Sequence, residues 1–204
     1  MRTLICSTLA LLLCVLVVGQ GCVLEDKVVE LVLSGETCVE FVEYHESAEW
    51  NTPIVLDYAE EIRQILEDND IDIEKMKKAL LKSVSYEVLI LQGDDDWDVS
   101  GFITVKRDAG EAKNIVEYTS QSLKGVLQKP KYANLNAAGV AIINAALASF
   151  LADPYVPIIL TFEVDNDAVD PVPTGAKPLS FTWEACLQIH IIYEEEFEMP
   201  EILP

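Results

Sequence analysis

The chain has 204 residues, half of them hydrophobic, and a formal net charge of −21 at pH 7. This much apolar sequence excludes a disordered protein, and the length suits one ordinary domain. The negative charge argues against nucleic acid as a partner, because like charges repel, and leaves cations, basic proteins and neutral glycans.

The first 21 residues have the composition of a secretory signal peptide. They contain Arg2, no acidic residue, and an apolar segment from Leu4 to Val18. This segment is shorter than the roughly 20 residues of a membrane-spanning helix, so we expect residues 1–21 to be removed. Residues 22–204 are then expected to form a single β-sandwich-like domain.

The stretch VVGQGC, which ends at Cys22, could be cut after Gly21 by either of two signal peptidases, which read different residues. Gly19 and Gly21 fit the small residues read by the ordinary signal peptidase, which would release a soluble periplasmic or secreted protein. Cys22 resembles the lipobox cysteine of bacterial lipoproteins, with Gly19 at the position where that family usually has an aliphatic residue. The resemblance covers the first 22 residues. It implies a lipid on Cys22 that attaches the protein to a membrane, and Val23, which is not Asp, favours the outer membrane.

Strand-like segments at 28–33 and 37–44 come next, and Ser34-Gly35 either separates them or forms a bulge in one long strand. Residues 57–67 have one apolar helical face and Asp57 in the capping position. A second short helix is predicted over 73–82, so residues 57–82 are expected to form a helical hairpin. Further strands are predicted at 83–91, 101–106 and 114–122.

The loop QGDDDWDVSG (92–101) is a candidate metal site. Asp94, Asp96 and Asp98 alternate and can offer carboxylate oxygens to Ca²⁺, although the residues at the glycine and glutamate positions of an EF-hand do not match. The alternative is an ordinary acidic turn. Trp97 either is exposed and binds a glycan or a protein, or folds back on the sheet edge.

An uncharged helix is predicted over 136–152, where Asn144 near its middle favours packing on a sheet over a membrane span. A strand at 158–164, a loop at 165–178, a strand at 180–193 and an acidic tail complete the chain.

Cys38 and Cys186 are the two cysteines left if the signal is removed and Cys22 is acylated. Strict alternation over 180–193 places Cys186 on the more polar face of the last strand, and Cys38 lies on the outward face of an early strand. The two form a disulfide if these strands are neighbours. Otherwise they are two shielded thiols.

The order of elements indicates a mainly β fold, an antiparallel β-sandwich with helical insertions, and α+β is the alternative. The usual hydrolase and nucleotide-binding motifs are absent from the sequence. We therefore expect a non-catalytic structural or partner-binding protein that requires no cofactor. The alternatives are a calcium-dependent module for glycan or protein, and a carboxylate-based hydrolase.

Overall fold

The computed structural model describes residues 24–200, so the predicted signal peptide and Cys22 lie outside the described residues. The chain divides into two compact units. Residues 32–193 form one unit, and all sites discussed below lie in it. The described part of the other consists of the strand ends at 24–31 and 194–200.

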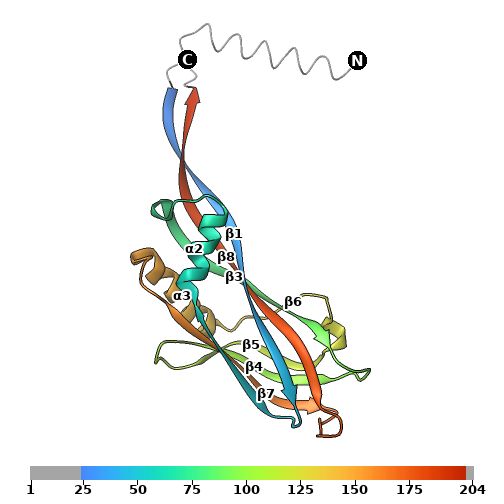
Figure 1. The fold of residues 1–204 in the computed structure, drawn as a ribbon. Coiled ribbons are helices and arrows are strands. Elements are labelled where there is room, and N and C mark those ends of the chain that lie inside the picture. Colours follow the sequence, from blue (N-terminus) through green and yellow to red (C-terminus); the bar gives the residue numbers. More distant parts are fainter. Residues whose placement is uncertain (1–23, 201–204) are drawn as a thin grey trace, which may run out of the picture. The chain divides into compact units, whose positions relative to one another are not determined.

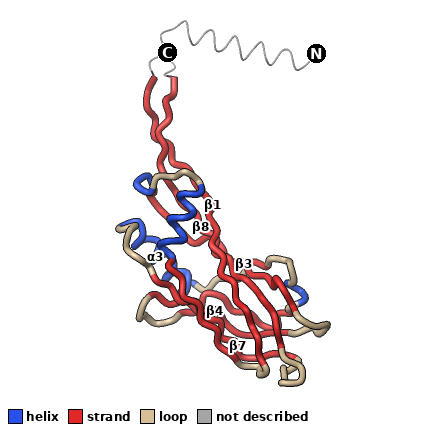
Figure 2. Tube along the Cα trace, in the orientation of Figure 1, coloured by secondary structure: helices blue, strands red, loops and turns tan. Residues whose placement is uncertain are grey.

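Two sheets of four strands form the fold, which confirms the predicted mainly β sandwich with helical insertions (Figures 1 and 2). Sheet A has the order β1-β8-β3-β6 and sheet B the order β2-β7-β4-β5. The strands are β1 (Leu24–His45), β2 (Trp50–Asp57), β3 (Met76–Leu91), β4 (Asp98–Arg107), β5 (Lys113–Ser122), β6 (Lys131–Tyr132), β7 (Ile159–Asp170) and β8 (Leu179–Pro200). The helices are α2 (Tyr58–Asp68) and α3 (Ala137–Ala152), with short 3-10 turns η1 (Ile73–Lys75) and η2 (Lys124–Val126).

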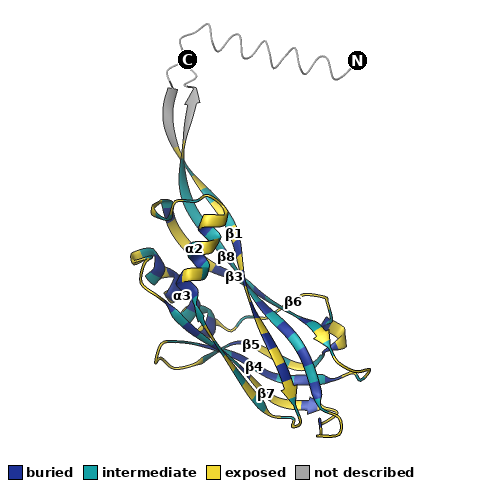
Figure 3. Ribbon diagram, viewed as in Figure 1, coloured by how far each residue is buried: buried dark blue, intermediate teal, exposed yellow. Residues whose placement is uncertain are grey.

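Alternating side chains build the core, as Figure 3 shows along β1 and β8. In β1, Val39 and Phe41 are buried while their neighbours are exposed, and the odd-numbered residues of β8 from Phe181 to Ile191 are buried. Phe41 stacks on Trp183 with a 4.6 Å separation between ring centroids. The period of two predicted these buried faces correctly.

Strand ends extend further than predicted. β1 is continuous through Ser34-Gly35, so the two predicted segments form one long strand. The residues after 193, expected as an acidic tail, continue β8 as far as Pro200. Part of the loop expected at 165–178 belongs to β7, which pairs with β4 up to Asp170.

The predicted second helix over 73–82 is wrong. Only η1 is helical there, and Met76 begins β3. The pairing of β3 with β8 shifts register between Met76 and Lys78 and again between Leu81 and Ser83. Each bulge adds one residue, so the buried positions are two or three residues apart and do not keep the strict period of two that identifies a strand in sequence.

α3 packs against β3 of sheet A and against β4 and β5 of sheet B, which explains its uncharged sequence. A side chain at Gly139 would meet the backbone, because a Cβ there would lie 2.6 Å from the carbonyl oxygen of Asn114. Asn144 Oδ1 accepts a hydrogen bond of 2.9 Å from the backbone N–H of Leu81, at the second bulge of β3. No helix in the described range, 24–200, is long and apolar enough to cross a membrane.

α2 begins as predicted, with Asp57 accepting from the backbone N–H of Ala59. It packs directly on β1, since a Cβ on Gly35 would lie 2.5 Å from Cγ2 of Ile65. β2, which leads into α2, was not predicted. It contains Pro53, which lacks a backbone N–H, and its position at the edge of sheet B tolerates this residue.

Candidate binding face around the disulfide

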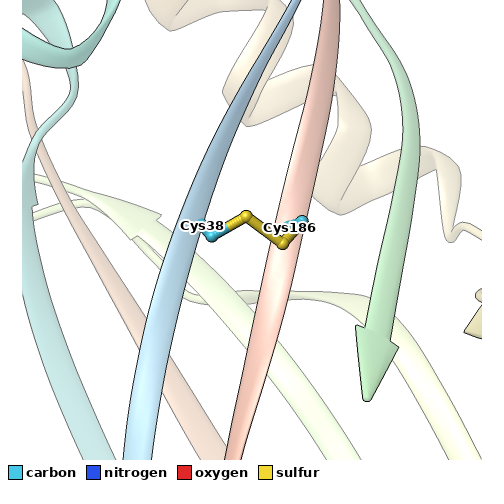
Figure 4. The surroundings of a disulfide bond; sticks show 2 residues. All are labelled: Cys38 and Cys186. Carbon is cyan, nitrogen blue, oxygen red and sulfur yellow. A yellow bond between two sulfur atoms is a disulfide. The ribbon is translucent and has the colours of Figure 1, made fainter. Parts of the chain in front are cut away.

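Cys38 and Cys186 are bonded to each other and join β1 to β8 (Figure 4). These strands are neighbours in sheet A, which is the condition on which the predicted pairing depended. The two Cα atoms are 4.0 Å apart, nearest to the roughly 4.5 Å of residues that face each other in an antiparallel pair without mutual backbone hydrogen bonds. The bond faces outward, away from the core, as the alternation predicted for both strands.

A groove of about 310 Å³ lies over this bond on the outer face of sheet A. We call it the disulfide groove. It is lined by Glu36, Cys38, Ser85, Tyr86, Glu87, Pro130, Tyr132, Glu184 and Cys186. Glu87 and Glu184 are direct cross-strand partners, an arrangement in which two like charges oppose each other and weaken the sheet. The groove is therefore a place where added positive charge would be stabilising.

Exposed apolar side chains share this outer face. Val42 and Tyr44 of β1 are 73% and 60% exposed, and Tyr132 of β6 is 71% exposed. They lie on the same side of the sheet as the disulfide, because side chains two residues apart on a strand point the same way and Tyr132 pairs with Ser85. Exposed apolar side chains gathered on one face are typical of a surface that binds a partner.

Within the described residues, one group of three potential metal ligands is found, formed by Glu36, Cys38 and Cys186. Because the two sulfur atoms are bonded to each other, the group is a disulfide beside a carboxylate and does not make a metal site.

The predicted calcium ligands are not gathered into such a group in the described chain. Asp96 accepts a 2.9 Å hydrogen bond from Ser122, and the neighbouring Asp95 pairs with Lys177 at 2.8 Å. Asp94 is exposed, and Asp98 is the first residue of β4. The loop has the contacts of an acidic turn tied to nearby strands.

Trp97 is buried, with 2% of its surface exposed. Its backbone carbonyl accepts from Leu123, and the ammonium group of Lys177 lies 5.7 Å from the centre of its ring. Trp97 therefore folds back on the sheet edge, which was the second of the two interpretations of this residue. A ring in this position offers no face to a sugar.

Glu43 is a buried carboxylate that the sequence reading did not identify as notable. It is 1% exposed, and its oxygens accept from His45 Nε2 at 2.5 Å, Thr52 Oγ1 at 2.8 Å and Trp183 Nε1 at 3.4 Å. Since Thr52 belongs to β2, this network joins the two sheets. The hydroxyl donates to Glu43 and not to His45, so the arrangement differs from a nucleophile–histidine–carboxylate triad. A charged residue at an inward position of an alternating strand was the signal that could have revealed it.

A cavity of about 40 Å³ lies between the sheets and is lined by aromatic residues that include Trp50, Tyr118 and Trp183. It is smaller than the roughly 150 Å³ of a cavity that holds benzene, so it does not suit an organic ligand. Tyr118 donates to Asn166 at 3.3 Å. Burial raises the pKa of the Tyr118 phenol, and the negative charge of Glu43 adds to the effect.

Comparison with protein-family models finds no match, and a search of curated proteins finds no relative of this chain.

Proposed function

We propose that this chain is an exported protein, held on the cell envelope by a lipid on Cys22, that binds a partner through the outer face of sheet A. Where the cell has an outer membrane, that membrane is the proposed location. The protein acts without catalysis and without a required cofactor. The observation that carries the binding role is the disulfide groove, with its opposed glutamates and neighbouring exposed tyrosines.

Export is supported by the bond between Cys38 and Cys186. Such bonds persist in oxidising compartments, and the cytosol of most cells keeps thiols reduced. The lipid anchor rests on the resemblance of the first 22 residues to bacterial lipoproteins. A non-catalytic role is favoured because the most enclosed carboxylate, Glu43, is occupied by hydrogen bonds that tie the sheets together.

Intact-mass spectrometry of protein purified from its native membrane tests location and processing. We expect a chain that begins at Cys22, carries acyl mass, and is lighter by two hydrogens that Cys38 and Cys186 lose on oxidation. A soluble species cut after Gly21 without acyl mass would contradict the anchor, and free thiols at both positions would contradict export.

Site-directed photo-crosslinking tests the binding role. A benzophenone amino acid at Tyr132, which lines the disulfide groove, is expected to give a discrete adduct in native membranes. The matched control carries the same benzophenone amino acid at Tyr155, an equally exposed tyrosine in the loop after α3. We expect its adduct yield to be at least tenfold lower. Glu87→Lys with Glu184→Lys should abolish the adduct. Equal yields from the two tyrosines would argue against a binding role for this face.

A further inference from the structure

The four edges of the two sheets differ in how they are protected against pairing with another strand. β2 carries Pro53 at its edge. The second edge of sheet A is β6, which has only two residues, and the side of β3 that it leaves open is covered because Gln128 donates to Val88 and Ala133 donates to Val84. The edge of β5 is engaged by Asn136, which donates to Ile115.

β1 is the remaining edge and has no such protection. It ends sheet A on the side away from β8, and from Val32 to Tyr44 it contains neither proline nor a basic residue. In the part of the chain that the structure describes, no backbone hydrogen bond joins these residues to a loop or a helix. Natural proteins rarely leave a long edge strand in this condition, because it is a template for strand addition.

The disulfide shows which backbone groups of β1 are free. A Cα–Cα distance of 4.0 Å identifies Cys38 and Cys186 as a pair without mutual backbone hydrogen bonds. In such a pair each residue directs its N–H and C=O away from the other strand. Cys38 therefore directs both groups to the open edge, and alternation gives Glu36, Glu40 and Val42 the same direction.

The side chains of these residues determine what fits beside them. Glu36 and Glu40 are exposed and acidic, and Val42 and Tyr44 are exposed and apolar. A second copy of the chain would bring the same glutamates and a further net charge of −21, so charge disfavours self-pairing. A segment with basic residues opposite Glu36 and Glu40 would gain two cross-strand charge pairs.

We propose that an extended segment of a partner protein adds to sheet A beside β1, with lysine or arginine opposite Glu36 and Glu40 and apolar residues opposite Val42 and Tyr44. The main-chain bonds supply affinity and the alternate side chains supply specificity. This inference rests on the proposed partner-binding function and specifies its edge and its partner chemistry.

Two synthetic peptides probe the edge of the full mature protein. Val-Thr-Val-Thr-Lys-Thr-Ser-Thr-Lys matches β1 in the antiparallel direction, and its reversed sequence matches the parallel direction. We expect one of them to bind saturably, with amide NMR shifts concentrated on residues 36–44. A peptide with glutamate in place of both lysines should not bind.

Charge-neutral variants test the side-chain contacts. Glu36→Gln with Glu40→Gln should weaken binding about fivefold, since two cross-strand pairs of about 0.5 kcal/mol each are lost. Glu67→Gln with Glu74→Gln removes the same charge from exposed positions outside sheet A and should leave the affinity unchanged.

A backbone variant tests strand addition itself. Val42→Pro removes an N–H that faces the open edge and no bond to β8, so the protein should fold and lose at least tenfold in affinity. Val42→Thr keeps the N–H and should stay within threefold. If the proline variant does not fold, peptides N-methylated at alternate amides test the same contact on the unchanged protein. The peptide methylated at the amides that face β1 should fail to bind.

Three results would overturn the inference: shifts located away from β1, equal binding of the glutamate peptide, or a β1-mediated homodimer in analytical ultracentrifugation that excludes the peptide. If the peptides do not bind β1 but the Tyr132 adduct forms, the partner binds the outer face of sheet A and does not add a strand to its edge. Loss of both would reject the proposed function as well.

Discussion

Glu43 occupies a position on β1 that alternation otherwise fills with Val39 and Phe41. A buried carboxylate is costly unless donors surround it, and here His45, Thr52 and Trp183 do so. The residue is best understood as a polar tie between the sheets, whose removal would leave several donors without an acceptor.

We predict that Glu43→Leu lowers the free energy of unfolding by about 3–5 kcal/mol, the usual cost of breaking a buried charged network. Glu40→Gln, at an exposed position of the same strand, should change it by less than about 0.5 kcal/mol. Urea denaturation measures both. Similar small effects from the two variants would show that Glu43 does not hold the sheets together.

Tyr58 is fully buried, and among the described residues its hydroxyl has no hydrogen-bond partner. Burial raises the pKa of this phenol, with a smaller contribution from the charge of Glu61. Because the folded state favours the protonated phenol, its contribution to stability is complete below the unfolded pKa of about 10 and declines as the pH rises above it.

Tyr58→Phe should therefore not destabilise the protein at pH 7, and a gain of about 1 kcal/mol is expected because a buried unpartnered hydroxyl is removed. Above pH 10 the variant should lose less stability than the parent. Thermal melts from pH 7 to pH 11 check both expectations, and a lower melting temperature at pH 7 would show that the hydroxyl has a stabilising contact.

At the scale of elements, β3 and α3 depend on each other. Asn144 of α3 accepts a hydrogen bond from the backbone N–H of Leu81, which lies next to a bulge of β3. From sequence, Asn144 argues only against a membrane span. Its bond to residue 81 could not be predicted, because nothing near residue 144 indicates that strand.

Asn144→Leu should cost about 1–3 kcal/mol, since it leaves the buried N–H of Leu81 without an acceptor. Hydrogen exchange at the Leu81 amide should accelerate in the same variant. Ala141→Ser, an exposed position on α3, serves as the control and should affect neither quantity. Unchanged exchange at Leu81 would mean that another group satisfies it.

At the scale of the whole molecule, the disulfide joins residues 148 positions apart. Restraining so long a loop in the unfolded chain is worth about 4–5 kcal/mol on loop-entropy grounds, comparable to a large part of the stability of a small domain. The acidic surface acts in the opposite sense, because its self-repulsion opposes the compact state.

Cys38→Ser with Cys186→Ser should lower the free energy of unfolding by about 4 kcal/mol. Reducing agent should have a similar effect on the parent protein and none on the double variant. Urea titrations with and without reductant measure this difference, and a parent protein insensitive to reductant would contradict it.

The sequence by itself determined the features that depend on neighbours in the chain: the alternating faces of β1 and β8, the Asp57 cap and the outward direction of both cysteines. Tertiary structure decided which strands are neighbours, and with that the disulfide, the groove and the open edge of β1. It also made a strand of the segment from Met76, because pairing with β8 accommodates bulges that disguise its period. Long-range pairing of this kind depends on residues more than 100 positions apart, and no local pattern carries that information.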